Sequence, residues 1–236
     1  MSHVYFGRPI RAVVLDFDGT LVHSTVDFSR MKLQLMGELE GKTIPQGFVD
    51  QSITVTENVG WIYSHLSSTG RADEWEAVEA LISGMMERAE MERVHLTSPV
   101  DGSREAVLEL RRMGLRVGLL TRGSRRYATA AIGYAGLGGI MDALMFRDDH
   151  GEREAKPNPI ALRRMARLLD VPVEECLMVG DHSIDSICAA GAGAAFLGVL
   201  TGSFSEDDWR QAGCRYVDSV VDVPGALSRA DRPLRP

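Results

Sequence analysis

The chain has 236 residues, a length that allows one large domain or one domain with an insertion. Its 44% hydrophobic and 25% charged residues are ordinary for a globular protein with a substantial core, and no apolar run is long enough to span a bilayer. The formal net charge of -7 gives no sign of a nucleic-acid footprint, although an acidic enzyme can bind an anion through a metal or local cations.

The N-terminal stretch MSHVYFGRPIRAVV has no long apolar segment after a basic start, so we expect no signal peptide. Three cysteines, Cys176, Cys188 and Cys214, lie far apart and form no CxxC motif. They indicate neither a disulfide framework nor a zinc site, and a reducing cytoplasm fits them better. The basic, proline-bearing end, residues 229–236, is expected to be a frayed tail.

The first strongly predicted strand is the apolar run Ala12–Leu15, and it ends in the sequence LDFDGT. This sequence places two carboxylates, Asp16 and Asp18, two residues apart directly after the strand. Gly19 would let the backbone turn sharply at that point. Taken alone, such a sequence is compatible either with a turn or with a catalytic pair of acids.

Helical periodicity dominates the next part of the chain. Residues 27–40 and 72–94 are amphipathic with helical spacing, and the ambiguous stretch between them, 41–68, is expected to be mostly helix because no alternation supports strands. We therefore predict an all-helical cap domain over residues 23–95. It interrupts a core domain made of residues 1–22 and 96–236.

Apolar strands alternate with helices from about residue 98 onward. The strands are expected at 115–120, 176–180 and 194–200, and the helices that precede them at 102–114, at 159–170 and in a short stretch ending near Gly191. Continuous apolar strands alternating with helices are typical of a parallel sheet covered on both faces. The predicted fold is therefore α/β, with a Rossmann-like parallel sheet, helices on both faces and an inserted helical cap.

Three of the predicted strands are followed directly by a polar residue: Asp16, Thr121 and Asp181. In an open parallel sheet the carboxyl ends of the strands line a common crevice where ligands bind, so these side chains and Asp18 are expected to meet. Carboxylates in one crevice repel one another unless a cation lies among them. Hard oxygen ligands favour Mg²⁺, which leaves coordination positions for water and phosphate.

The same residues could carry out phosphoryl transfer. Asp16 is the candidate nucleophile, since a carboxylate can attack phosphorus, and Asp18 could protonate a leaving alkoxide and then deprotonate water. The Thr121 hydroxyl and nearby N–H groups could hold phosphate oxygens, and Lys156 could neutralise charge on the transferred group. Asp185, one helical turn beyond the last strand-end acid, could orient the metal or a bound water.

Four segments resemble, in order and spacing, the motifs of the haloacid dehalogenase superfamily. They are DFDGT (16–20), LLTRG (119–123), KPNP (156–159) and GDHSID (180–185). The resemblance covers the chain from residue 11 to about residue 200. The helical insertion directly after the first motif resembles the cap of the phosphoglycolate phosphatase-like branch.

This resemblance implies a magnesium-dependent phosphatase that acts on a small phosphorylated metabolite through an aspartyl-phosphate. It implies these roles: Asp16 as nucleophile; Asp18 as acid and base; Mg²⁺ on the Asp16 carboxylate, the Asp18 backbone carbonyl and Asp181; Asp185 as metal support; and Thr121 and Lys156 as phosphate ligands. It leaves the oligomeric state and the natural substrate open. From the net charge and the lack of a long apolar run we expect no nucleic-acid or membrane partner.

Two positions depart from the usual motifs. The second motif commonly continues with Asn after the threonine, whereas Arg122 stands here and adds a charge, so we include it among the phosphate-binding candidates. In the first motif His23 stands where an acid is common, before Ser24. We interpret this second change as a difference at the cap hinge.

Two alternatives remain. A phosphomutase resembling β-phosphoglucomutase would use the same two aspartates, with a sugar hydroxyl in place of water as the attacking group. A non-catalytic binding module on the same scaffold would bind Mg²⁺ and an anion without turnover, but it would have no chemical need for Asp18. Dehalogenases and phosphonatases fit poorly because, by family resemblance, they lack this second acid.

Overall fold

Six parallel strands form the central sheet of the computed structural model, which describes residues 3–5 and 7–228. In spatial order they are β10 (Tyr216–Val217), β9 (Ala195–Val199), β8 (Cys176–Gly180), β3 (Ala12–Leu15), β6 (Arg116–Leu120) and β7 (Ala143–Met145). The first strand of this sheet in chain order, β3, lies between β8 and β6, so later strands are added on both sides of it. Such a reversal of strand order opens a crevice at the carboxyl end of β3.

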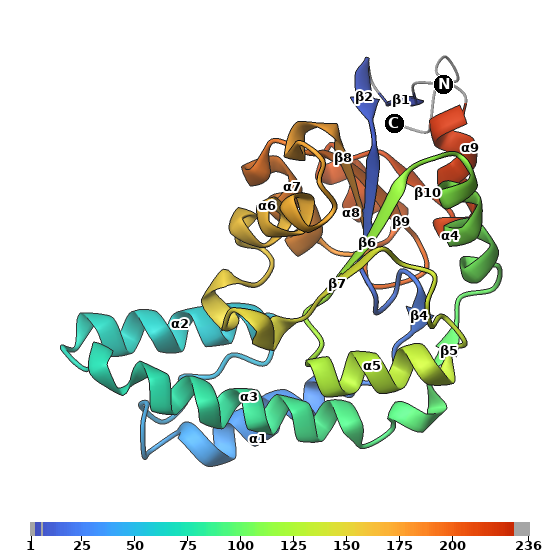
Figure 1. The fold of residues 1–236 in the computed structure, drawn as a ribbon. Helices are drawn as coiled ribbons and strands as arrows, with labels where there is room; N and C mark the ends of the chain where they lie inside the picture. Colours follow the sequence, from blue (N-terminus) through green and yellow to red (C-terminus); the bar gives the residue numbers. More distant parts are fainter. Residues whose placement is uncertain (1–2, 6, 229–236) are drawn as a thin grey trace.

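Helices cover both faces of the sheet (Figure 1), because the central strands are apolar on both sides. Val13 and Leu15 belong to the apolar cluster on one face, and Val14 belongs to the cluster on the other. The first cluster includes α4 (Ser103–Arg112), α5 (Arg125–Tyr134) and α9 (Val223–Ser228), and the second includes α6 (Pro159–Leu168) and α7 (Ser183–Ala192). The predicted α/β fold with a Rossmann-like parallel sheet is confirmed.

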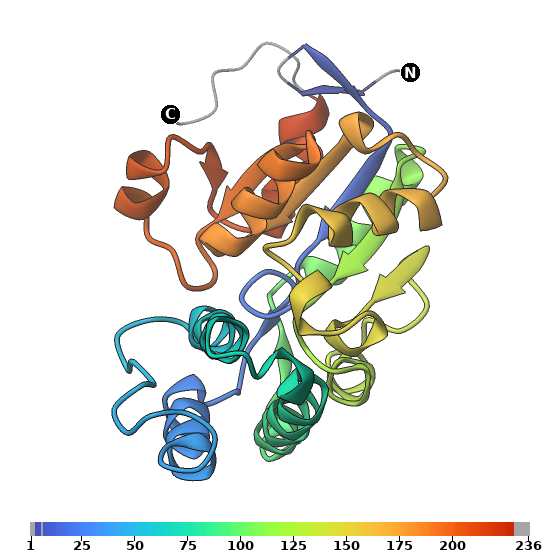
Figure 2. The ribbon, with the colours of Figure 1, turned by 90° about the vertical axis from the view of Figure 1, so that its left-hand side faces the viewer.

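A separate apolar cluster joins the helices of the insertion, α1 (Phe28–Leu39), α2 (Val55–Ser68) and α3 (Trp75–Met91). Two of them, α1 and α3, correspond to the helices predicted at 27–40 and 72–94. The three helices lie together on one side of the sheet in both views (Figure 1, Figure 2). Because each presents its apolar stripe to the others, they share a core of their own.

The expectation of mostly helix over residues 41–68 is wrong for the first half of that stretch. Gly41 and Gly47 both have φ near +73°, a left-handed conformation that ends regular structure there. Helix α2 begins only after Thr54, whose hydroxyl accepts a hydrogen bond from the Glu57 N–H at 3.1 Å. The Glu57 carboxylate accepts from the Thr54 N–H in return, and this capping box fixes the start of the helix.

The insertion leaves and rejoins the rest of the chain at one small antiparallel ladder. In this ladder β4 (Val22–His23) pairs with β5 (Ser98–Pro99), with Val22 opposite Pro99. The segments on either side of the insertion are therefore neighbours in space. The division into a core of residues 1–22 and 96–236 and a cap of residues 23–95 stays a prediction.

The remaining elements are short. They are β1 (His3–Tyr5), β2 (Arg8–Ile10), α8 (Glu206–Gln211) and the 3₁₀ turns η1 (Ala72–Glu74), η2 (Val94–Leu96), η3 (Arg147–Asp149), η4 (Glu152–Glu154), η5 (Val173–Glu175) and η6 (Val220–Asp222). None of the helices within residues 3–5 and 7–228 has both the length and the apolar character that crossing a bilayer requires. The tail predicted at 229–236 lies outside the described residues.

Candidate active site

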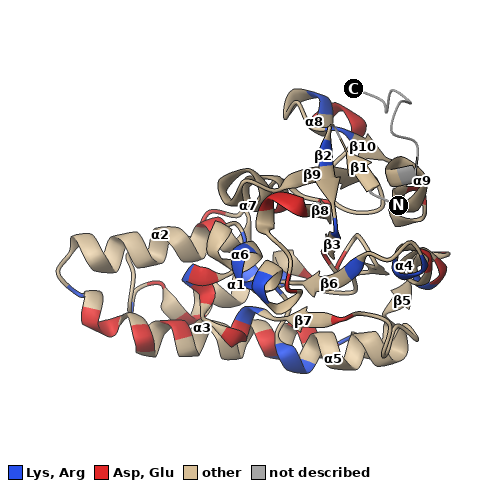
Figure 3. Cartoon of the chain, turned by 45° about the horizontal axis from the view of Figure 1, so that its top comes forward, with Lys and Arg blue, Asp and Glu red and all other residues tan. Residues whose placement is uncertain are grey.

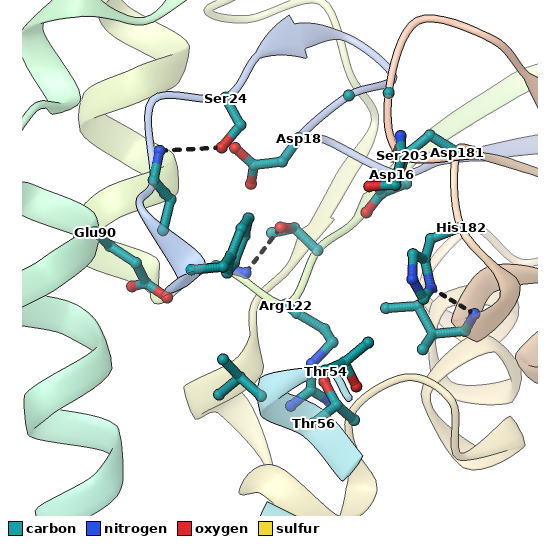
Figure 4. A pocket seen from close by; sticks show the side chains of 18 of the residues that line it. Asp16, Asp18, Ser24, Thr54, Thr56, Glu90, Arg122, Asp181, His182 and Ser203 are labelled. Atoms are coloured by element: carbon teal, nitrogen blue, oxygen red, sulfur yellow. Dashed lines mark hydrogen bonds between the residues drawn. The ribbon is translucent and has the colours of Figure 1, made fainter. Parts of the chain in front are cut away.

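A cavity of about 670 Å³ opens at the carboxyl ends of the central strands. Asp16, Thr121 and Asp181, which follow β3, β6 and β8, lie on its core side. Residues of the helical insertion, among them Thr54 and Thr56, form the side opposite (Figure 4). The cavity therefore lies between the sheet and the insertion, where side chains from both can reach one bound molecule.

Asp16 is held at the centre of the site by the strand that precedes it. Every residue of β3 is buried, and the Asp16 N–H continues the ladder by donating to the Val179 carbonyl at 2.9 Å. One carboxylate oxygen of Asp16, Oδ1, accepts a hydrogen bond from Lys156 Nζ. The other, Oδ2, accepts a long bond of 3.4 Å from the Thr20 hydroxyl. Its weaker partner leaves Oδ2 the better placed of the two to attack an electrophile.

Three buried carboxylates come together here. Oxygen atoms of Asp16, Asp181 and Asp185 lie within 4.8 Å of one another. Burial, the largest cause, and the charge on Asp16 together raise the pKa of both Asp181 and Asp185 to about 7. Lys156, whose Nζ lies 2.6 Å from Asp185 Oδ1, offsets only part of this repulsion. The cluster is therefore short of positive charge.

The shape of the site around Asp181 also fits a small cation. A β-carbon on Gly19 would lie 2.6 Å from Asp181 Oδ2, and one on Gly202 would lie 2.1 Å from the same atom. Bare backbone thus packs directly against this carboxylate, which also accepts a 2.6 Å hydrogen bond from the Ser203 N–H. A compact set of hard oxygen donors suits a small divalent cation.

This cluster predicts that stabilisation by Mg²⁺ depends on pH. Without metal, the raised pKa values of Asp181 and Asp185 make a contribution to folding stability that is full below about pH 4 and is lost as the pH rises through about 7. A bound cation takes the place of these protons. We therefore expect millimolar Mg²⁺ to raise the melting temperature more at about pH 8 than at about pH 5. Scanning calorimetry with and without Mg²⁺ measures this difference.

The matched control for this measurement is Asp181→Asn. Because it removes one carboxylate from the cluster, it should abolish most of the Mg²⁺-dependent shift at the higher pH. An equal shift at both pH values in the unmodified protein would contradict the assignment of this cluster as a cation site.

Asp18 is placed apart from the three clustered carboxylates. It lies beyond Phe17 and before Gly19, whose φ of +80° turns the chain sharply. The Tyr127 hydroxyl donates a 2.5 Å hydrogen bond to Asp18 Oδ1. Burial raises the pKa of Asp18 to about 6, although the Tyr127 hydrogen bond lowers it in part. A carboxyl with this pKa can both give and take a proton near neutral pH.

The turn after β6 carries Thr121 and Arg122. Thr121 is buried, and its hydroxyl accepts a 2.9 Å hydrogen bond from the Gly123 N–H. The Arg122 guanidinium borders the cavity, but its two terminal nitrogens donate to the Glu152 carboxylate and to the Lys156 carbonyl. Its charge is thus already paired within the protein.

Lys156 is almost completely buried and connects two of the clustered acids. Its ammonium group donates to both Asp16 and Asp185, and these two negative charges raise its pKa against the effect of burial. The structure therefore brings Asp16, Lys156, Asp181 and Asp185 into direct contact or close proximity. Asp18, Thr121 and Arg122 line the cavity beside them.

Sequence reasoning missed several residues of this site. Ser203 lies in the loop after β9 and not directly after the strand, so the rule that found the other strand ends does not select it. Tyr127, which contacts Asp18, lies inside a helix without any motif of its own. Glu90 and Arg147 also border the cavity, and no local signal separates them from solvated helix-face and loop charges.

Known proteins resemble this chain in sequence and in fold. A sequence model of the haloacid dehalogenase-like hydrolases matches residues 10–193. A phosphoglycolate phosphatase of Cereibacter sphaeroides is 31% identical over 188 residues, which cover 78% of this chain and 82% of that protein. A plasmid phosphoglycolate phosphatase of Cupriavidus necator is 28% identical over 226 residues, which cover 94% and 95%.

Among solved structures, a protein from Bacteroides fragilis described as a haloacid dehalogenase-like hydrolase superposes with a TM-score of 0.67. The superposition covers 91% of this chain and 99% of that chain, at 21% sequence identity. At this identity the likeness bears on the fold alone.

Proposed function

The chain belongs to the haloacid dehalogenase-like hydrolase family and is a phosphatase, and from this premise we propose that it hydrolyses a small organic phosphomonoester with the help of Mg²⁺. We propose that the reaction passes through an aspartyl-phosphate on Asp16. The observation that carries the proposal is the position of the Asp16 carboxylate on the core side of a cavity. It lies there among two further acids and a buried lysine.

In the first step of the proposed reaction, Asp16 Oδ2 forms a bond to phosphorus while the bond from phosphorus to the leaving oxygen breaks. Lys156 stays bound to Oδ1 and orients the carboxylate. The Thr121 hydroxyl, Lys156 and the Arg122 N–H in the turn after β6 hold the phosphoryl oxygens as negative charge develops on them. Asp18 gives its proton to the leaving alkoxide, so that an alcohol departs.

In the second step the ionised Asp18 takes a proton from a water molecule. The resulting hydroxide attacks phosphorus and breaks the bond to Asp16, which releases inorganic phosphate and restores the Asp16 carboxylate and the protonated Asp18. Tyr127 remains hydrogen-bonded to Asp18 and sets its orientation. One acid thus serves as proton donor and then as proton acceptor.

The Asp16 carboxylate, the Asp18 backbone carbonyl and Asp181 would hold Mg²⁺, with Asp185 in support. When bound, the ion supplies positive charge that offsets the charge on the phosphoryl oxygens. The raised pKa values of Asp181 and Asp185 and the bare backbone around Asp181 support this assignment.

The helical insertion, proposed here as a cap domain over residues 23–95, would contact the leaving group. Phe28, Thr54 and Thr56 line its side of the cavity with one aromatic ring and two hydroxyl groups. A cap that closes over the crevice excludes bulk water and bulky substrates. The names of the relatives make a phosphoglycolate-like compound the first substrate to test.

The three cysteines are free, as in a protein of the reducing cytoplasm.

The proposal is tested by phosphate release from a panel of small phosphates that includes 2-phosphoglycolate, glycerol phosphate and hexose phosphates. We expect release that stops on chelation, returns with Mg²⁺ and reaches a turnover of about 1 to 10³ s⁻¹ on the best substrate. Isomerisation of a hexose phosphate without net release would instead identify a phosphomutase. Binding of Mg²⁺ and phosphate with no turnover on any compound would identify a binding module.

A further inference from the structure

A network of buried charges lies beside the active site and takes no part in the proposed chemistry. Glu90 near the end of α3, Arg147 after β7 and Glu152 in η4 are all almost completely buried. Arg147 forms ion pairs with both acids, at its Nη1 with Glu90 and at its Nε with Glu152, where the distance is 2.7 Å. Burying charges is costly unless each is paired, so these residues hold one another in a defined geometry.

The same side chains hold the backbone of the turn after β6, residues 121–124. Arg147 Nη1 donates to the Arg122 carbonyl at 2.8 Å, and the Ser124 N–H donates to Glu90 Oε2 at 3.1 Å. The Arg147 N–H also donates to the Gly123 carbonyl at 3.2 Å. Within the described part of the chain the Arg122 N–H has no acceptor, so it is available to a phosphate oxygen.

The network also reaches Lys156 through its backbone. Glu152 pairs with the Arg122 guanidinium, which in turn donates to the Lys156 carbonyl. The Lys156 ammonium group then contacts Asp16. Residues 147–156, called here the bridging segment, thus begin at the Arg147 ion pairs and end at the lysine in the site.

Helices of the insertion contact the bridging segment at three points. Glu90 on α3 pairs with Arg147, and Glu79 on the same helix accepts a 2.7 Å hydrogen bond from the Glu152 N–H. On α2 the ring of Tyr63 lies 3.8 Å from the Arg153 guanidinium carbon. Acidic side chains recur along α3 (Figure 3), and two of them meet this segment.

We propose that Glu90 and Arg147 are positioning residues for phosphoryl transfer. Through the bridging segment they fix the turn 121–124 and Lys156 relative to Asp16, and Glu90 does so from the insertion. The position of α3 therefore determines whether the groups that hold the phosphoryl oxygens are correctly arranged. This inference rests on the proposed function, and it predicts an effect on the transferred phosphoryl group whatever the leaving group is.

The chain offers a matched control one helical turn away. Glu87, also on α3, forms an ion pair of 3.1 Å with Arg126 on α5, and that arginine is largely exposed. Glu87→Gln therefore breaks a contact between α3 and the α5 helix without touching the buried network. Glu90→Gln keeps the size of the side chain and removes only its charge.

The experiment compares these variants as Mg²⁺-loaded protein. It measures kcat and KM for p-nitrophenyl phosphate and for an alkyl phosphate, together with the Kd of inorganic phosphate by calorimetry. We expect Glu90→Gln to lower kcat about tenfold on both substrates and to weaken phosphate binding about as much. Glu87→Gln is expected to stay within about twofold of the unmodified protein. A KM effect alone, or an effect on one substrate only, would overturn the positioning role.

A second variant keeps the test decisive should Glu90→Gln fail to fold. Glu79→Gln weakens the acceptor for the Glu152 N–H but leaves every buried charge paired, and we expect about a threefold loss in kcat on both substrates. Glu79→Gln and Glu90→Gln proteins that match Glu87→Gln in kcat and in phosphate affinity would refute the inference. An unmodified protein that releases no phosphate from either substrate would refute the proposed function instead.

Discussion

Asp16→Asn is expected to lower kcat by about 10⁴-fold or more, the largest effect of any substitution in this chain. An amide nitrogen or oxygen does not replace a carboxylate as a nucleophile toward phosphorus, while the side chain keeps its size and its place after β3. Lys156 retains its contact with Asp185, so the buried lysine keeps a partner. Steady-state phosphate release on the best substrate of the panel measures the effect.

The control for this substitution is Asp73→Asn, which changes an exposed carboxylate in η1 and should leave turnover unchanged. Circular dichroism of both variants checks that the fold is intact. Full turnover by Asp16→Asn would remove the basis for a covalent intermediate at this residue.

Asp18→Asn is expected to separate the two steps of the reaction. With an alkyl phosphate, loss of the proton donor should reduce kcat about 10³-fold. With p-nitrophenyl phosphate the leaving group needs no proton, so the first step should proceed at a rate reduced by about tenfold or less. The second step lacks its base, and the phosphorylated protein should therefore accumulate.

Rapid mixing with p-nitrophenyl phosphate measures this accumulation. The account predicts a burst of nitrophenolate equal to the amount of protein, followed by slow turnover. Tyr127→Phe serves as a control, because it removes the hydrogen-bond donor of Asp18 but keeps the carboxylate, and it should show no such burst. Equal losses on both substrates without a burst would mean that Asp18 neither gives a proton to the leaving group nor takes one from the attacking water.

The sequence was sufficient to predict the central strands β3, β6, β8 and β9 because they are continuous apolar runs, whereas the short edge strands β7 and β10 were not predicted. The predictions at 115–120, 176–180 and 194–200 agree with β6, β8 and β9 to within one residue at each end. Because the carboxyl ends of parallel strands meet at one edge of a sheet, the sequence alone also predicts that Asp16, Thr121 and Asp181 share a crevice, and all three line the cavity. Their roles in the reaction stay predictions.

Elements that depend on pairing between distant segments could not be predicted in the same way. The two-residue strand β10 is too short to carry a periodic signal, and β1 and β2 form a ladder outside the main sheet. The mixture of polar and apolar residues in the loop before α2 is compatible with a helix. The left-handed backbone conformations of Gly41 and Gly47 exclude one. Local periodicity does not report such backbone constraints.

The buried charges beside the site were also beyond prediction. Glu90 and Arg147 are separated by 57 residues, and each looks locally like a solvated charge. Only the packing of α3 against α5 and the bridging segment removes them from water and joins them. Burial of this kind depends on tertiary structure, so a single sequence does not distinguish these charges from the half-buried Glu87 and the exposed Arg126.

The most direct test of the account is to identify the residue that becomes phosphorylated. Protein quenched during turnover would be treated with borohydride, which reduces an acyl phosphate on aspartate to homoserine, and then mapped by peptide mass spectrometry. We expect homoserine at position 16 in the unmodified protein, more of it in Asp18→Asn, and none in Asp16→Asn. Modification of a different residue during turnover, or turnover with position 16 unmodified in every sample, would contradict it.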